Sequence, residues 1–340
     1  EQYYRRVPAE DLAQTAFLDL YGGALAHLNL ALERKPGVAI VRVYNPDFET
    51  HGWRSSHTVV EIVVDDTAFL VDSISMALNR LNYTIHLTAH PVIEVSRDQA
   101  GHLEAPGEPG TTALAESYIQ YQIDHQSNLQ TLKSTKRTIE QVIGEVVLAA
   151  SDRQIMRGRT LETVQPTNGF PAAVSHEAIE EAVALCRWIA DDLFTFLGSI
   201  VFDVAPGDSE QLVPQPDTAL GILRPTAETG LADRLAVLPV GMPGYLEGHE
   251  PLLITKANKR SNVHRPAYMD IIAVRHFDTA GTVTGETCLL GLFSAGAYNR
   301  AVTEVPALRL KLRRLLERSG LPANGHGIKV LQNIVENYPR

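Results

Sequence analysis

Side chains suited to binding an anion are concentrated in one short stretch of the sequence: Lys256, Asn258, Arg260, His264 and Arg265. Guanidinium and ammonium groups form charge-assisted hydrogen bonds with carboxylates and phosphates, so the stretch is a candidate ligand site. The same residues also suit a solvated sheet face or a surface of ion pairs between domains. We favour this second interpretation, because nothing in the pattern itself requires a ligand.

Residues 252–260 alternate as a strand does, so every second side chain shares one face. That face begins with Leu252 and Ile254 and continues to Lys256 and Arg260, so it changes from apolar to cationic. We expect its first end under covering helices and its last end at a rim. A buried ammonium group without a partner is costly. We therefore expect carboxylates of this chain to hold Lys256 and Arg260, with three candidates nearby in sequence: Asp270, Asp278 and Glu286.

A second candidate site is Asp65-Asp66-Thr67, which follows the β-branched run 58–64 and precedes an apolar helical stripe. Short acceptor side chains at this position are typical of a helix N-cap, which is the interpretation we favour. The functional alternative is a ligand site in which the two carboxylates bind an α-ammonium group.

No motif for catalysis or cofactor binding occurs in the sequence. Gly241-Met242-Pro243-Gly244 has neither the spacing nor the strand-to-helix context of a dinucleotide fingerprint, and a nucleophile elbow, a P-loop and a His-Glu-x-x-His motif are all missing. The 12 histidines are scattered, so we predict no metal site and no catalytic residue. Cys186 and Cys288 lack redox or metal spacing, and Cys186 lies on an apolar stripe typical of a core.

Composition limits the class of protein. The chain has 340 residues, of which 30 are Lys or Arg and 40 Asp or Glu, a net charge of −10 that argues against nucleic acid as a partner. Its 44% hydrophobic content can fill two or three domain cores. No run is long and apolar enough for a membrane span, and the low cysteine content suits a reducing compartment, so we expect a cytoplasmic protein.

The first part of the chain predicts the element order strand, helix, strand, strand, helix. After helices in 1–34 and a strand at 38–44, these elements occupy residues 58–64, 70–81, 84–95, 117–124 and 132–150, with a loop at 100–112. This order is typical of a ferredoxin-like α+β fold with helices on one face of the sheet.

The second part predicts two strands, a helical middle and a three-stranded meander. A linker at 152–170 precedes a helix capped by Ser175, strands at 199–204 and 211–213, a helical fragment at 231–238, and a meander at 252–293 with a turn at Gly281. This is the order of a PAS-like domain. The helix beginning at Thr303 should expose a solvated basic face, and a short helix at 327–337 should follow.

The amino-acid sequences of several segments resemble those of the bacterial long-chain NAD-specific glutamate dehydrogenases. The similar segments are FLVDSISMALNRLNYTIHLTAHPVIEV, DDLFTFLG, LLITKANKRSNVHRPAYMD, GETCLLGLFSAGAY and IKVLQNIVENYP. The resemblance implies N-terminal helices at 1–36, an ACT-type domain at 37–165, a PAS-like domain at 170–302 and a helical segment at 303–340. It also implies a catalytic domain downstream, with NAD as the cofactor of the parent enzyme and none in this part.

The resemblance thus predicts a regulatory and assembly region of an enzyme that oxidises L-glutamate, inactive by itself. Its partners would be other domains of the parent chain, further copies in a homo-oligomer and an amino-acid effector. Ligand-binding ACT domains usually carry a glycine between first strand and first helix, whereas Asp65-Asp66-Thr67-Ala68 has none, so we expect no tight ligand there. A stand-alone sensor and a structural scaffold remain the alternatives.

Overall fold

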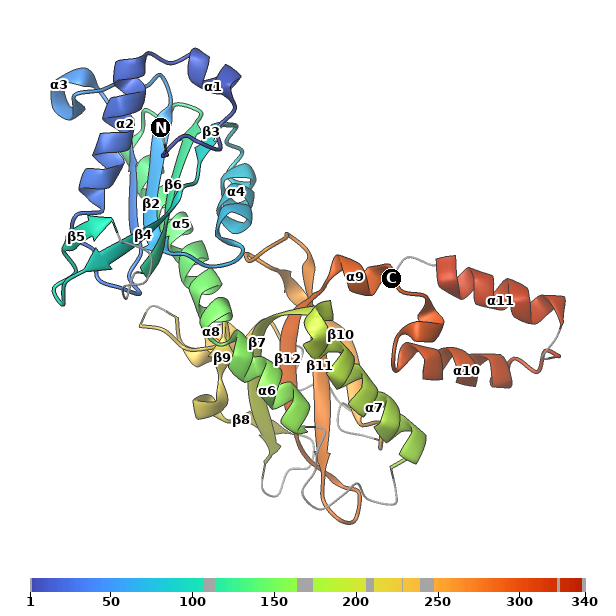
Figure 1. Cartoon of the computed structure of the whole chain (residues 1–340). Helices are drawn as coiled ribbons and strands as arrows, with labels where there is room; N and C mark the ends of the chain where they lie inside the picture. The colour runs from blue at the N-terminus through green and yellow to red at the C-terminus, as the bar shows by residue number, and fades with distance from the viewer. Residues whose placement is uncertain are drawn as a thin grey trace. The chain divides into compact units, whose positions relative to one another are not determined.

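The computed structural model describes residues 2–106, 114–163, 174–205, 211–227, 229–238, 248–322 and 325–337. The chain divides into two compact units. The first comprises residues 1–147 and the loop 262–266, and the second comprises residues 148–261 and 267–340. Each unit is built on one antiparallel sheet (Figure 1).

The sheet of the first unit has the order β1-β2-β6-β4-β5, with β3 also paired to β6. In chain order the elements are α1 (Ala9–Ala13), α2 (Phe17–Leu30), β1 (Ile40–Tyr44), α3 (Phe48–His51), β2 (Thr58–Asp65), α4 (Leu70–Arg80), β3 (Ile85–Ala89), β4 (Val92–Arg97), β5 (Leu103–Pro106), β6 (Leu114–Ile123) and α5 (Leu129–Ser151). From β2 to α5 the order is strand, helix, four strands, helix, because the strand predicted at 84–95 is divided into β3 and β4 and β5 is an additional strand. The outer place beside β2 is taken by β1, which comes earlier in the chain.

Helices cover both faces of this sheet, which corrects the expectation of helices on one face. On one face Val63 and Tyr118 pack with Ala31, which directly follows α2. On the other face the Tyr121 hydroxyl donates to the carbonyl of Val71 in α4, at 3.1 Å. Figure 1 shows α2 and α4 on opposite sides of the sheet. Because both faces are covered, nearly all of β2 is buried and its sequence is an apolar run rather than an alternation.

The sheet of the second unit has the order β10-β11-β12-β7-β8, with the short β9 also paired to β7. Its elements are α6 (Arg153–Thr163), α7 (His176–Trp188), η1 (Ile189–Leu193), β7 (Phe194–Val204), β8 (Leu212–Pro214), η2 (Pro216–Thr218), β9 (Leu220–Gly221), α8 (Leu231–Leu235), β10 (Leu252–Arg260), β11 (Tyr268–Phe277), β12 (Val283–Phe293), α9 (Ala295–Tyr298), η3 (Val302–Glu304), α10 (Leu308–Arg318) and α11 (His326–Asn337). Met156 of α6 and Leu185 of α7 join Phe194, Ile272 and Leu289 of the strands in one core.

Local predictions for this unit are partly confirmed. Ser175 caps α7 by accepting from the N–H of Ala178, and Cys186 is fully buried. Gly281 has φ +91° in the turn between β11 and β12, where Asp278 Oδ1 accepts from two backbone N–H groups. The Leu252 end of β10 packs against the core, as expected.

Other local predictions are wrong. Residues 153–163 form α6 rather than a linker, and β5 lies in the expected loop at 100–112. The helix beyond Thr303 starts at Leu308, and three of its basic side chains, those of Arg309, Arg313 and Arg314, form ion pairs while remaining partly exposed. Arg309 Nε lies 2.8 Å from Glu181, and Arg313 pairs with Glu177.

The segment Gly241-Met242-Pro243-Gly244 lies outside the described residues. In the described part of the chain, no helix is long and apolar enough to cross a membrane.

Candidate functional site

Asp65 and Asp66 bind groups of their own chain rather than capping a helix. Asp65 ends β2, pairs with Arg34 and accepts from the N–H of Gly37 at 2.7 Å. The Ser117 hydroxyl donates to Asp66, and half-buried Thr67 lies in the turn that follows. The predicted N-cap is therefore wrong, because the turn continues to Phe69 before α4 begins at Leu70.

The backbone of Phe69 has φ +71°, a left-handed conformation that suits glycine and costs other residues roughly 1–2 kcal/mol. Phe69 thus has a glycine-like backbone conformation in the turn between first strand and first helix, where ligand-binding ACT domains usually carry a glycine. Its ring lies against the His264 imidazole, with 4.5 Å between the ring centroids.

A buried ion cluster is linked to this turn through the ion pair between Arg34 and Asp65. Glu116 accepts from both Arg34 and Arg97, and all three side chains are almost completely buried. Burial raises the pKa of Glu116, but the hydrogen bonds from the two guanidinium groups outweigh it and hold the pKa below its usual value. With Asp65 added, two acids neutralise two bases, so this cluster is internally satisfied.

The cationic stretch of the sequence is divided between the two units. In the second unit Lys256 Nζ lies 2.6 Å from Asp270, whose side chain is buried, so the expectation that a carboxylate of this chain holds Lys256 is confirmed. Asn258 donates to the carbonyl of Ala236 at 3.1 Å. The Arg260 guanidinium lies over the ring of Tyr268, 5.0 Å from its centroid.

His264 and Arg265 belong to the loop 262–266, which groups with the first unit. The N–H of His264 donates to the Ser73 hydroxyl of α4 at 2.9 Å, and Asn262 accepts from Arg80 and donates to Glu145. These contacts anchor the loop. Of the five residues singled out from the sequence, three thus belong to the second unit and two to the loop that groups with the first.

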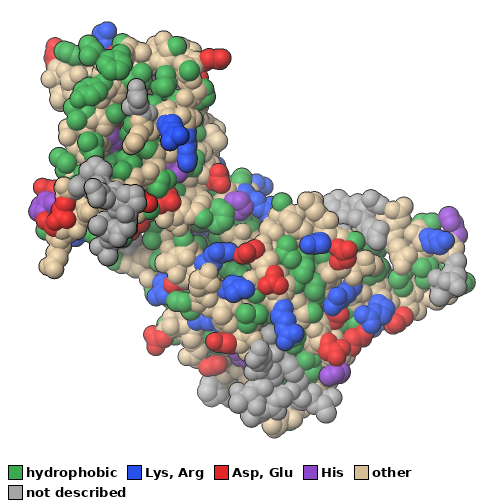
Figure 2. Space-filling view, in the orientation of Figure 1, with side chains coloured by type: hydrophobic (Ala, Val, Ile, Leu, Met, Phe, Trp, Pro, Cys, Tyr) green, Lys and Arg blue, Asp and Glu red, His purple; other side chains and the backbone are tan. Residues whose placement is uncertain are grey.

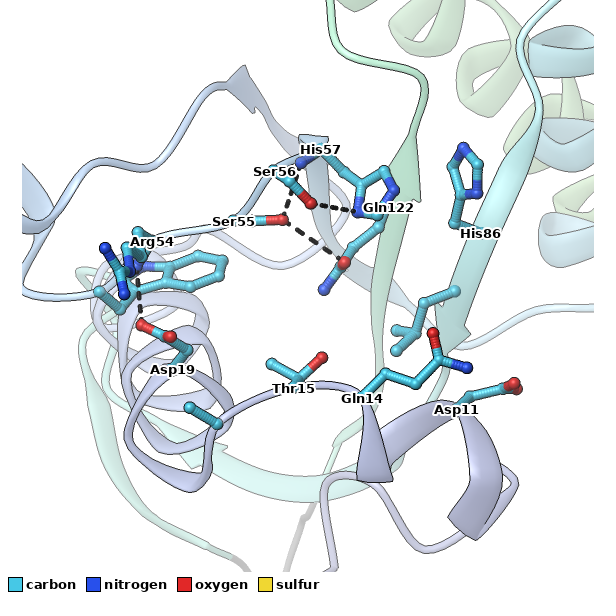
Figure 3. A pocket seen from close by; sticks show the side chains of 13 residues that line it. Asp11, Gln14, Thr15, Asp19, Arg54, Ser55, Ser56, His57, His86 and Gln122 are labelled. Carbon is cyan, nitrogen blue, oxygen red and sulfur yellow. Dashed lines mark hydrogen bonds between the residues drawn. The ribbon is translucent and has the colours of Figure 1, made fainter.

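The first unit has a polar pocket of about 640 Å³ that the sequence did not reveal (Figure 3). It lies between the α1–α2 connection, the loop that precedes β2 and the strand β3. Basic and imidazole groups come from Arg54, His57 and His86, acidic groups from Asp11 and Asp19. The lining thus carries both signs of charge.

The two imidazoles of this pocket, His57 and His86, stack with 4.2 Å between their centroids. Burial, followed by repulsion from His86, lowers the pKa of His57 below its ordinary value. His86 Nε2 lies 2.8 Å from Asp124, whose pKa is lowered to about 2 by the Thr84 N–H and by His86. These groups can orient a small polar ligand through hydrogen bonds.

The sequence could not reveal this pair, because His57 and His86 belong to separate segments that only the sheet brings together. Within the described ranges, no group of three or more His, Cys, Asp or Glu side chains is arranged to hold a metal ion.

Two models of known protein families match the two ends of the chain. A family model described as glutamate dehydrogenase, ACT1 domain, matches residues 1–139, and one described as glutamate dehydrogenase, helical motif 1, matches residues 305–340. NAD-specific glutamate dehydrogenases of Halomonas elongata and Pseudomonas aeruginosa are each 34% identical to the chain, across 99% and 100% of it. Over its whole length the chain is therefore similar to NAD-specific glutamate dehydrogenases.

The chain matches the N-terminal region of these dehydrogenases and spans only 21% of the length of both relatives. The NAD-specific glutamate dehydrogenase of Mycobacterium tuberculosis is 24% identical across 93% of the chain, which covers 18% of that relative. A solved RNA-binding light-oxygen-voltage receptor aligns at 12% identity with a TM-score of 0.20, which supports no argument.

Proposed function

We propose that this chain is the regulatory and assembly region of an enzyme that converts L-glutamate, NAD⁺ and water to 2-oxoglutarate, ammonium and NADH. The observation that carries the proposal is the match of the whole chain to about a fifth of NAD-specific glutamate dehydrogenases. The sequence itself has no dinucleotide fingerprint. Catalysis therefore belongs to the remaining part of the parent protein.

An activity assay tests this division. The purified 340-residue chain, given L-glutamate and NAD⁺, should form no NADH, whereas the full-length parent protein should form it. Turnover by the 340-residue chain alone would refute the proposal. A gene that ends without a downstream dinucleotide-binding domain would instead favour a stand-alone sensor.

We propose a PAS-like architecture for the second unit. Its support is the sheet order, in which β7 lies beside β12 and the hairpin partners β8 and β11 lie outside them. We also propose a cytoplasmic location, in keeping with the buried, unpaired Cys186 and Cys288.

A second candidate function is the sensing of an amino acid, and the pocket of Figure 3 favours it. A zwitterion needs a cationic and an anionic partner, and the pocket lining includes Arg54 together with Asp11 and Asp19, whose carboxylate accepts from the N–H of Arg54 at 3.0 Å. The turn at Asp65 and Asp66 is a poorer candidate, because its carboxylates already bind Arg34, the Gly37 N–H and Ser117.

Calorimetric titration with a panel of amino acids distinguishes a ligand in the pocket from a ligand in the turn at Asp65 and Asp66. Any binding should weaken in the Arg54→Gln variant and remain in the Asp66→Ala variant. Submillimolar binding that Asp66→Ala abolishes would place the effector in the turn and refute our choice of pocket.

A further inference from the structure

The exposed side of α2 carries a continuous row of large apolar side chains. The row, here called the α2 stripe, consists of Phe17, Leu18, Tyr21, Leu25, Leu28 and Leu32. Phe17 and Leu18 are 77% and 73% exposed, Tyr21 is 61% exposed, and the three leucines are between 42% and 47% exposed. At 3.6 residues per turn the helical members fall within about 100° of arc. Figure 2 shows hydrophobic side chains gathered over this part of the first unit.

The stripe is not the face by which α2 packs on its own unit. The opposite face carries Gly23 and His27, both buried, and His27 reaches the carbonyl of Ile62. A Cβ atom added at Gly22 would lie 2.4 Å from the Trp53 side chain, so the helix sits close to its neighbours there. The fully buried residues of α2 therefore lie on the face away from the stripe.

The area and charge of the stripe suit an interface between proteins. If each of the six side chains is given roughly 150–250 Å², the range for large aromatic side chains, the exposed fractions of the stripe amount to on the order of 600 Å² per copy. A contiguous apolar patch of that size lies at the upper end of the largest patches found on monomers, and such patches are often functional. Two such patches together reach the lower end of specific interfaces, about 1,200 Å² in total. The exposed side chains of α2 are uncharged, so in a chain of net charge −10 this face avoids repulsion between copies.

We propose that the α2 stripe pairs with the α2 stripe of a second copy, with the two helices antiparallel about a two-fold axis at Leu25. In this register Leu18 faces Leu32 of the other copy, and Tyr21 lies across from Asn29 and next to Leu28. The aromatic end of each stripe therefore meets the leucine end of its partner, as a self-complementary two-fold interface requires. Leu25 faces itself at the centre.

This inference rests on the assembly role proposed above and specifies the surface that performs it. The two can fail separately, because a monomeric chain would leave the NADH assay and its outcome unchanged.

Sedimentation equilibrium of the 340-residue chain tests the interface. We expect a reversible monomer–dimer equilibrium in the micromolar range. Leu25→Glu places two carboxylates together at the axis and should weaken dimerisation at least ~tenfold. Leu129→Glu is the matched control, because Leu129 is 72% exposed and outside the stripe; it should leave the equilibrium unchanged. A wild-type chain that stays monomeric at about 100 µM, or equal dimerisation of both variants, would overturn the proposal.

Cross-linking with a short bis-maleimide tests the register and does not depend on the charge variants. Leu25→Cys should cross-link to itself, and Leu18→Cys should cross-link to Leu32→Cys in a mixture but not to itself. The native thiols of Cys186 and Cys288 are buried and do not compete. Self-linking of Leu18→Cys as efficient as in the mixture would rule out the antiparallel arrangement.

Discussion

His27, on the buried face of α2, should remain neutral far below the pH at which histidine usually takes up a proton. Its Nε2 lies 3.1 Å from the carbonyl of Ile62, which can only accept, so Nε2 carries the hydrogen. Nδ1 therefore accepts from the Tyr3 hydroxyl at 2.6 Å. Burial is the main cause that lowers the pKa of His27 to about 3, and the nearby Arg42 contributes.

The magnitude follows from linkage between protonation and folding. In the unfolded chain the imidazole protonates below its ordinary pKa of about 6.5, whereas in the folded chain it does not until about pH 3. Stability is therefore lost as the pH falls through this window, at up to about 1.4 kcal/mol per pH unit. Between pH 7 and pH 5 the expected loss from His27 is about 2 kcal/mol.

Urea unfolding at pH 7 and pH 5 measures this loss. In a Trp188→Phe background Trp53 is the only tryptophan left of two, so its fluorescence reports on the first unit. His27→Gln keeps a donor for Ile62 and an acceptor for Tyr3 but cannot titrate. Between pH 7 and pH 5 the free energy of unfolding of this variant should fall by about 2 kcal/mol less than that of the chain with His27. The control variant His125→Gln, at an exposed position, should show the same fall as the chain with His27.

An NMR titration of the His27 ring gives a check that does not rely on the variant folding. The signal should keep its neutral-state shift down to pH 5. A midpoint near pH 6.5, or equal pH dependence with and without His27, would refute the burial argument.

Two further substitutions test buried charges. Glu116→Gln should destabilise the first unit by about 3–5 kcal/mol in urea unfolding, because Arg34 and Arg97 are then buried without their shared carboxylate. Lys256→Met should lower the stability of the second unit by roughly 1 kcal/mol, because buried Asp270 loses its ammonium partner, and it should leave any effector response of the parent enzyme intact.

Exposed residues of β4, which pairs with β6, and of β10 provide controls for both. Glu94→Gln and Lys259→Met change the same side-chain types at solvated positions, and each should shift stability by less than about 0.5 kcal/mol. If Lys256→Met left the melting temperature unchanged but abolished an effector response, β10 would be a regulatory strand. If Glu116→Gln cost no more than its control, the ion cluster would not stabilise the fold.

The sequence by itself determined the order and type of most elements. A β-branched run predicted β2, alternation predicted β6 and apolar runs predicted the meander. Apolar stripes predicted α4, α5 and α7, because local periodicity reports which face of an element is buried. It also predicted that Lys256 binds a carboxylate of this chain, since alternation placed that ammonium group at the edge of an apolar face.

Only the tertiary structure decided which segments meet. It gave β1 the outer place in the first sheet, covered the second face with α2, and brought the imidazoles of His57 and His86 together. It placed Phe69 at the N-cap of α4 and paired Asp65 with Arg34, because a carboxylate binds the strongest donor within reach, and that donor comes from a distant segment. The α2 stripe was hidden for the same reason: its leucines have the spacing of a buried face, and only the packing of the opposite face leaves them exposed.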